Sequence, residues 1–306
     1  MMKNSVFTDG GQWYKGNMHC HTTMSDGTFT PAQRAAMYKE KGYSFLSLTD
    51  HNVFASYPEF CDEQFLMIPG TERDVNDPDY PYFCLHALGI SEREIPEKVH
   101  EQLRCYGRDK VDIPWQDLID EMRAAGQMVI LAHPVWSRNT PEQFLALTDY
   151  VGIEVYNRLC EMDSHTGKAD YFIDCCLRKG KKVLLFAHDD SHGWDHTDSD
   201  CFGGWIMVKA PELSWPSLLR AIQSGSFYAS TGPEIYDFGM EDGKVYINCA
   251  PCEEIHFVTY PHRGESIFRS GSTHAEFIPQ EGQDYVRCEV IDSRGRVAYT
   301  NPIYLG

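Results

Sequence analysis

Strand-like and helix-like runs alternate through the first two thirds of the chain, and this alternation limits the folds that the sequence can adopt. Apolar runs typical of strands cover residues 43–48, 64–70, 82–90, 127–133, 151–157 and 181–188. Helix-like runs cover residues 30–42, 115–125, 141–149 and 167–179, and Thr30 can cap the first of them. Alternating strands and helices predict an α/β fold with a mainly parallel sheet and helices outside it. About seven such units in roughly 210 residues favour a barrel over an open sheet.

The sequence changes character near residue 233. A helix-like run at 215–224 leads into SGSFYASTGP and then into short alternating runs at 244–250, 254–260, 284–292 and 298–305. The turn signals EDG, HRGE and SRGR separate these runs, a pattern typical of a small all-β, sandwich-like domain. We therefore expect a barrel over residues 1–232 and an all-β domain over residues 233–306. A lid or a dimer-forming unit is the plainest role for the second domain, and carbohydrate or partner binding is the alternative.

Composition argues against several classes of protein. The 306 residues carry a formal net charge of −18, which repels polyanions and disfavours tight binding to duplex nucleic acid. No run of about 18 apolar residues could cross a membrane, and the stretch MMKNSVFTDGGQWYKG lacks the apolar core of a secretory signal. The cysteines number eleven, and several lie inside apolar runs, so we expect reduced thiols. These features together predict a cytoplasmic protein.

Side chains that bind metals recur at or near the ends of the strand-like runs. They are His19, His21, Asp50, His51, Glu72, His86, His133, Asp190 and His192. The carboxyl ends of barrel strands converge on one face, so these side chains are expected to lie together. A single His-x-His or Thr-Asp-His pattern is weak, because such pairs are frequent on surfaces and in cores. The ordered series is what predicts a site.

The chemistry of these side chains fits a metal centre. Neutral imidazole and carboxylate are ligands of zinc, manganese and iron. Residues i and i+2 of an extended strand point to the same side, so His19 and His21 can share one cation while Cys20 points away. A carboxylate such as Glu72 can bridge two cations. Two or three divalent cations about 3.5–4 Å apart are the usual device for phosphoester hydrolysis.

Taken in order, the motifs resemble the PHP family, named for its polymerase and histidinol phosphatase members. The motifs are His19-Cys20-His21, Ser25-Asp26-Gly27, Thr49-Asp50-His51, Gly70-Thr71-Glu72, His86-Ala87-Leu88-Gly89, Ala132-His133-Pro134, Ile153-Glu154-Val155-Tyr156-Asn157 and Asp190-Ser191-His192. The likeness is closer to the stand-alone phosphoesterase branch than to the polymerase-linked one. FGGW at 202–205 and SFYASTGP at 226–233 look like a subgroup with a C-terminal β module.

The resemblance implies a distorted (β/α)7 barrel, similar to a TIM barrel, with two or three divalent ions of manganese, zinc or iron. One ion would be held by His19, His21, Glu72 and Asp190, a second by Glu72, His86 and His133, and a third by Asp26, His51 and His192. Family members hydrolyse phosphoesters with a metal-bound hydroxide. The catalytic set carried over by motif is His19, His21, Glu72, His133, Asp190 and His192.

The chain departs from the family pattern at a few positions. His188 and Asp189 replace the usual small residues before the last motif, and Arg73 follows Glu72 where a smaller residue is common. Arg138 and Arg158, just past two of the motifs, are candidates for bidentate phosphate binding, and the alternative for each is a surface arginine.

Three further residues are candidates for supporting roles. Asp50 is expected to orient a ligand histidine, and Asn157 to line the same face. His196 could protonate the leaving group, although a solvated histidine in the polar loop GWDHTDSD is the plainer interpretation.

The sequence therefore predicts a metal-dependent phosphoesterase acting on a small phosphate ester, such as a nucleotide or a short oligonucleotide. A small phosphorylated substrate is the expected partner, membrane association is not expected, and a homo-oligomer is left open. The alternatives are a metal-dependent hydrolase of an amide or cyclic ester on the same ligands, and a catalytically weak metal-binding scaffold.

Overall fold

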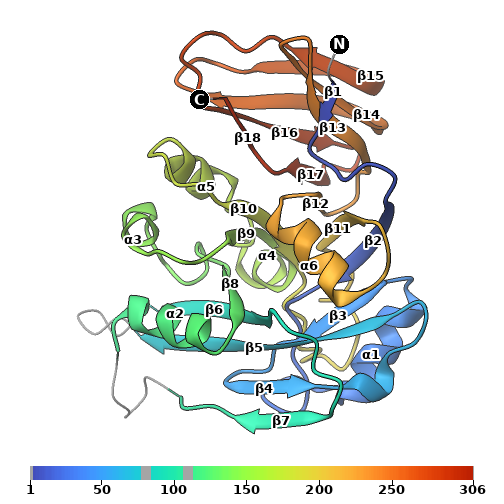
Figure 1. Cartoon of the computed structure of the whole chain (residues 1–306), viewed down its shortest axis with the longest axis vertical. Helices are drawn as coiled ribbons and strands as arrows, with labels where there is room; N and C mark the ends of the chain where they lie inside the picture. The colour runs from blue at the N-terminus through green and yellow to red at the C-terminus, as the bar shows by residue number, and fades with distance from the viewer. Residues whose placement is uncertain (1–2, 77–83, 106–112, 306) are drawn as a thin grey trace.

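The computed structural model describes residues 3–76, 84–105 and 113–305 (Figure 1). The helices are α1 (Pro31–Glu40), the 3-10 helix η1 (Pro58–Phe60), α2 (Trp115–Ala124), α3 (Pro141–Ala146), α4 (Arg158–Ser164), α5 (Asp170–Leu177) and α6 (Trp215–Gln223). The strands are β1 (Lys3–Ser5), β2 (Gln12–Asn17), β3 (Phe45–Leu48), β4 (Val53–Ser56), β5 (Leu66–Asn76), β6 (Cys84–Ser91), β7 (Val99–Gln102), β8 (Gln127–Leu131), β9 (Gly152–Asn157), β10 (Leu184–His188), β11 (Trp205–Ala210), β12 (Phe227–Ser230), β13 (Ile235–Glu241), β14 (Lys244–Tyr260), β15 (Glu265–Phe277), β16 (Tyr285–Ile291), β17 (Val297–Thr300) and β18 (Ile303–Tyr304). No helix of the described ranges is long and apolar enough to cross a membrane.

Local sequence signals account for the helix boundaries. Thr30 caps α1 as predicted, because its hydroxyl accepts a hydrogen bond from Gln33 N and the Gln33 side chain accepts one from Thr30 N. Helix α4 was not predicted. It begins after Asn157, whose Oδ1 accepts from Cys160 N at 3.0 Å. The first two residues of the strand expected at 82–90 lie outside the described residues.

The α/β class is confirmed, but the main sheet is mixed rather than mainly parallel. Strands β2, β3 and β5 pair in parallel, as do β8, β9 and β10, whereas β6 pairs antiparallel with both β5 and β8. The segment between β5 and β6 is seven residues long, residues 77–83, which is too short for the crossover that a parallel strand requires. The reversal puts the amino end of β6, where His86 lies, at the edge where the neighbouring strands have their carboxyl ends.

The sheet does not close into the expected (β/α)7 barrel. Among the strands that the structure describes, no ladder joins β10 to β2; their continuations meet only at one parallel bridge, between Cys20 and Ser191. There Asp190 N donates to His19 O and His21 N donates to Ser191 O, both at 2.9 Å. The reason is that β11 pairs antiparallel with β2 and leads the sheet on into β12 instead.

Antiparallel strands form the rest of the molecule. From β12 the pairing runs through β17 and β16 to β14, which pairs with both β13 and β15. Strand β14 is one strand of 17 residues, where the sequence predicted two shorter ones. Strand β1 pairs with β13, so the first described residues lie beside this all-β region (Figure 1). The domain boundary at residue 232 stays a prediction.

A buried ion pair connects helix α5 to strand β16. Arg287 Nε and Nη2 donate to the two carboxylate oxygens of Asp174, each at 2.8 Å, and Arg287 is only 1% exposed. Glu289 accepts from the remaining guanidinium nitrogen, Nη1. The two parallel hydrogen bonds from the planar guanidinium of Arg287 fix the position of β16 relative to α5.

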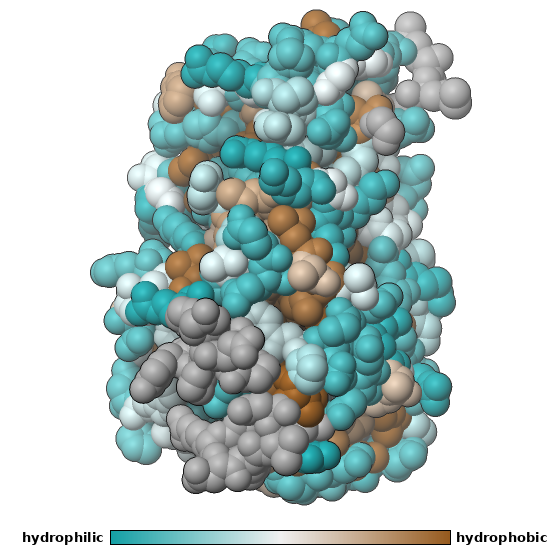
Figure 2. All heavy atoms as spheres, turned by 90° about the vertical axis from the view of Figure 1, so that its left-hand side faces the viewer, coloured by the Kyte–Doolittle hydropathy of each residue, from teal (hydrophilic) through white to brown (hydrophobic). Residues whose placement is uncertain are grey.

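The surface of the molecule is mostly hydrophilic, and its cysteines are unpaired. Hydrophilic residues cover most of the face drawn in Figure 2, and hydrophobic residues appear there as separate patches. All eleven cysteines are free thiols, and seven of them are buried, as expected for reduced core residues.

Candidate metal centre

The centre begins where β2 ends. His19 and His21 follow this strand and direct their Nε2 atoms at the same two carboxylates. His19 Nε2 lies 3.1 Å from both Glu72 Oε2 and Asp190 Oδ1, and His21 Nε2 lies 3.0 and 3.1 Å from the same oxygens. All four residues are buried. The i, i+2 prediction for the two histidines therefore agrees with the structure.

The atoms of this group are suited to a cation. His19 Nε2, His21 Nε2 and Glu72 Oε2 are buried, and within the described residues none of them has a hydrogen-bond partner of acceptable geometry. Buried polar atoms without a partner cost free energy, so convergence of several of them needs a compensating group. A divalent ion is such a group for two imidazoles and two carboxylates.

Glu72 also faces a second pair of histidines. Its Oε1 atom lies 2.8 Å from His86 Nδ1 and 3.3 Å from His133 Nε2, whereas Oε2 faces His19 and His21. His51 Nδ1 also lies 3.4 Å from Oε2, so one carboxylate presents its two oxygens to two different sets of imidazoles. This is the geometry required of a carboxylate that bridges two ions.

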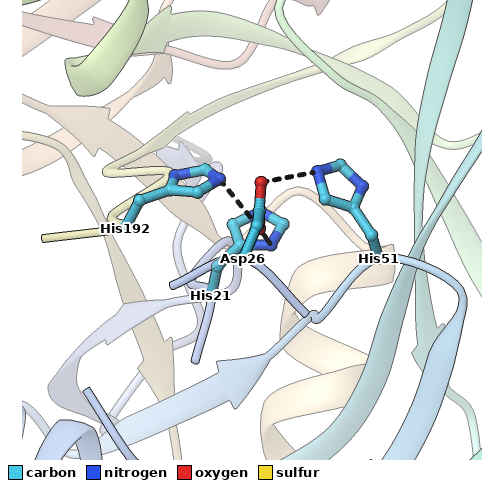
Figure 3. Close-up of side chains that lie close together, drawn as sticks. All are labelled: His21, Asp26, His51 and His192. Atoms are coloured by element: carbon cyan, nitrogen blue, oxygen red, sulfur yellow. Dashed lines mark ion pairs between the residues drawn. The ribbon is translucent and has the colours of Figure 1, made fainter. Parts of the chain in front are cut away.

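A third group gathers around Asp26 (Figure 3). Its carboxylate lies between His192 Nε2, at 3.4 Å, and His51 Nε2, at 4.0 Å, with His21 Nδ1 at 3.7 Å. The His21 and His192 rings stack with centroids 4.1 Å apart. The Asp26 side chain is 47% exposed, so this group lies on the solvent side of the centre. The nine predicted ligands are therefore brought together, and their roles as ligands stay predictions.

Electrostatics within the centre follow from burial and charge. Burial by itself lowers the pKa of His21, but the contacts with Asp190 and Glu72 outweigh it and raise the pKa to about 9. Burial raises the pKa values of Glu72 and Asp190, and the facing histidines outweigh it and hold both well below their usual range. Without a metal, protons therefore occupy the place of a cation, and metal binding must displace them.

Comparison with solved structures gives a match to the whole chain. A two-domain protein from Bacteroides vulgatus, described as containing a predicted PHP-like metal-dependent phosphoesterase, matches with a TM-score of 0.52 and 18% identity over 99% of both chains. The chain has this PHP-like fold. The resemblance drawn from the motifs is thereby confirmed at the level of the fold.

Two further structures match part of the chain. A candidate metal-dependent phosphoesterase from Bifidobacterium adolescentis is 17% identical, and an amidohydrolase from Chromobacterium violaceum, with bound sulfate and no metal, is 16% identical. Each match covers 58% of this chain and 87% of the other, with a TM-score of 0.42. No protein-family model and no curated protein matches the chain.

Glu154 lies among the residues of this candidate centre, and the sequence assigned it no role. It lies on β9, 1% exposed, and its Oε1 is 2.8 Å from His19 Nδ1 and 2.9 Å from His188 Nδ1. Its Oε2 accepts from His133 N and from Asn157 Nδ2, both at 2.9 Å. Because a carboxylate only accepts, His19 donates from Nδ1, so in the neutral imidazole that a metal needs, Nε2 is the free nitrogen toward Glu72. A charged residue inside the apolar run VGIEVYN was the available signal.

The three residues predicted as candidates for supporting roles differ in where the structure places them. Asn157 lines the centre as expected, since Nδ2 also donates to Asp190 Oδ2 at 3.1 Å. Asp50 accepts from the backbone and hydroxyl of Thr22 and from the hydroxyl of Ser25, so it orders the turn that carries Asp26. In the described part of the chain, no hydrogen bond joins it directly to a histidine predicted as a ligand. His196 is in an exposed loop and does not line the cavity described below.

The positions that depart from the family pattern have structural partners. His188 contacts Glu154, and Asp189 accepts from the backbone N–H groups of residues 202, 203 and 204, each at 2.8 Å. Arg73 is buried and donates to Asn52 Oδ1 and Arg104 O. None of these three residues lines the cavity.

A cavity of about 500 Å³ opens over the centre. Its described lining includes seven of the nine predicted ligands, all except His19 and His21, together with the acids Asp74 and Asp163. The indoles of Trp136 and Trp194 also line it and are 40% and 56% exposed. Trp136 packs on His86 and His133, and Trp194 packs on His192. Arg138 and Arg158 are not among the lining residues, so the structure does not bring either one to the centre.

Proposed function

We propose that this chain is a metal-dependent phosphoesterase of the PHP family that hydrolyses a small phosphate ester, such as a nucleotide or short oligonucleotide. The ligands of its two or three divalent ions, of manganese, zinc or iron, would be His19, His21, Asp26, His51, Glu72, His86, His133, Asp190 and His192. The observation that carries the proposal is the position of Glu72: Oε1 faces His86 and His133, and Oε2 faces His19, His21 and His51. A centre for a single structural ion has no need of a bridging carboxylate.

Divalent ions bound at such a centre supply Lewis acidity toward phosphoryl oxygens and lower the pKa of water. The residues of this chain would hold those ions and exclude bulk water. His19 and His21 are buried and do not line the cavity, so they form the closed side of the centre. Glu154 keeps the Nδ1 proton of His19 directed away from the ions. Asp26 and His192 border the cavity, where a substrate would approach.

The lining of the cavity supports a substrate of low charge. No lysine or arginine belongs to its described lining, while several carboxylates do. A phosphate group would be neutralised by the ions alone, and each additional phosphate would meet uncompensated carboxylates. The exposed indoles of Trp136 and Trp194 offer flat apolar surfaces to a leaving group.

Hydrolysis of an amide or cyclic ester is the second candidate. The observation that favours it is the same absence of basic side chains from the described lining, since a neutral carbonyl substrate needs no cation besides the metals. We also propose that residues 1–232 form a distorted barrel with its seam at the Cys20–Ser191 bridge, and that residues 233–306 form the second domain.

The test is hydrolysis by protein stripped of metal and reloaded with manganese, zinc or iron. Phosphate release from nucleotides, dinucleotides and sugar phosphates is measured beside hydrolysis of amides and lactones. We expect metal-dependent phosphate release that is lost in His19→Ala and Asp190→Ala. His196→Ala, an exposed histidine outside the cavity, is the matched control and should retain activity. Turnover confined to amides or lactones would replace the first candidate with the second, and no turnover by loaded protein would refute both.

A further inference from the structure

Arg158 lies at a second cavity, apart from the one that Glu72 lines. This junction cavity, of about 430 Å³, is formed by Arg158 and Glu161 of α4, by Tyr156 and Lys168, by the 201–203 segment, and by residues 231, 295–297 and 299. Three of its lining side chains are cations, Arg158, Lys168 and Arg296, and one, Glu161, is an anion. The lining of this cavity is therefore positive in a chain whose net charge is −18.

The backbone leaves room for the Arg158 side chain. A Cβ atom at Gly203 would lie 2.3 Å from Arg158 Cδ and 2.7 Å from its Nε, so only glycine allows the arginine to lie there. Arg158 Nη2 donates to Ser199 O at a long 3.3 Å. Its Nε is buried and, within the described ranges, lacks a hydrogen-bond partner. The guanidinium is thus held in the cavity with donor capacity left over.

Arg296 is held in a similar way from the opposite side of the junction. A Cβ atom at Gly232 would lie 2.4 Å from Arg296 Nε, and Asp292, which does not line the cavity, holds Nε and Nη2 at 2.7 Å. The carboxylate of Glu161 accepts from Gly167 N at 3.2 Å. Gly203 and Gly232 therefore each leave room for one arginine side chain in the junction cavity.

We propose that the junction cavity binds a small phosphate-bearing molecule, with Arg158, Arg296 and Lys168 as the groups that contact the phosphate. Guanidinium groups bind phosphate oxygens in pairs, and a dianion is balanced by two or more cations. The volume falls within the range of small-molecule sites, about 300–1,000 Å³, and the buried rings of Tyr156 and Tyr299 line it, which leaves space for an organic group. The ligand would lie against α4, which also contributes Leu159 and Cys160 to the metal cavity. This site does not depend on the function proposed for the metal centre.

The experiment uses the full chain, stripped of metal so that phosphate has no ion to bind. Inorganic phosphate and glycerol 3-phosphate are titrated by calorimetry, and thermal unfolding is followed against sodium chloride of equal ionic strength. We expect saturable binding and a rise in Tm. Arg158→Gln and Arg296→Gln should each weaken binding at least about ten-fold, because each removes a charge-assisted contact. Glu161→Gln should tighten it, because it removes the one anion.

Two further variants keep the test decisive. Arg294→Gln removes the same charge from an exposed residue of the same turn that does not line the cavity, so it should bind like the wild type. Lys168→Gln alters an exposed side chain that folding does not require, and it should weaken binding about three-fold. The proposal is overturned if the wild type shows no saturable binding, if Arg294→Gln weakens binding as much as Arg296→Gln, or if Lys168→Gln leaves the affinity unchanged.

Discussion

Replacing Glu154 by glutamine tests whether this buried carboxylate controls the metal centre. Its two oxygens are approached by four donors: Nδ1 of His19 and of His188 at Oε1, and His133 N and Asn157 Nδ2 at Oε2. An amide has the same shape but only one acceptor oxygen. In either orientation, its NH2 group must face two groups that now donate to the carboxylate.

Both orientations of the glutamine weaken the centre. If the NH2 group faces the rings, His19 must accept at Nδ1 and carry its proton on Nε2, the atom that faces Glu72 and Asp190. If it faces His133 N and Asn157 instead, two buried donors lose their acceptor, at about 1–3 kcal/mol each. Loss of a group that orients a metal-binding histidine typically weakens metal binding about 10–100-fold. We expect a loss in this range for Glu154→Gln, equal to about 1.4–2.8 kcal/mol.

The assay is competition between the protein and a chelator for zinc or manganese in phosphate-free buffer. Circular dichroism checks that the variant is folded. Glu161→Gln is the matched control, because it makes the same change on neighbouring α4, where the carboxylate contacts Gly167 N and no histidine. A folded Glu154→Gln protein that binds metal within about two-fold of the wild type would contradict the role assigned to this residue.

Three other predictions follow from contacts described above. In metal-free protein, folding raises the pKa of His21 from near 6.5 to about 9. The stability that its protonated form adds is therefore complete below pH 6.5 and is lost as the pH rises through 9. We expect the Tm of the metal-free protein to fall between these pH values and the Tm of the metal-loaded protein not to fall; a rise in the metal-free protein would contradict the argument. Glu72→Gln should lower the number of bound ions by at least one, as measured by elemental analysis, because it removes the proposed bridge, and unchanged stoichiometry would refute the bridge. Arg287→Met should lower the free energy of unfolding, measured with urea, by about 3–5 kcal/mol, because it leaves Asp174 buried and unpaired. Arg294→Met is the exposed control. Equal losses of stability in the two variants would show that the buried ion pair does not stabilise the fold.

The ligand positions could be predicted because strand periodicity and strand ends are local properties of the sequence. His19 and His21 follow β2, Glu72 lies on β5 and Asp190 follows β10, so they converge once the strands pair side by side. The capping of α1 by Thr30 is equally local.

The remaining features depend on pairing between distant segments. The sequence does not reveal that β11, rather than β10, forms a ladder with β2, since that choice is made between strands about 190 residues apart. The direction of β6 could have been inferred from its short connection to β5. The position of the Arg158 side chain could not have been inferred, because it depends on the space left by Gly203, more than 40 residues away in the sequence.

The pairing of β1 with β13 has a consequence for how this architecture can be inherited. Residues 3–5 lie in the all-β region, the chain then enters the main sheet at β2, and it returns to the all-β region only after β12. A genetic exchange that replaced the C-terminal part as one block would leave the first strand without its partner. The C-terminal block therefore depends on residues 3–5, and an exchange of that block has to keep a strand edge that pairs with β1.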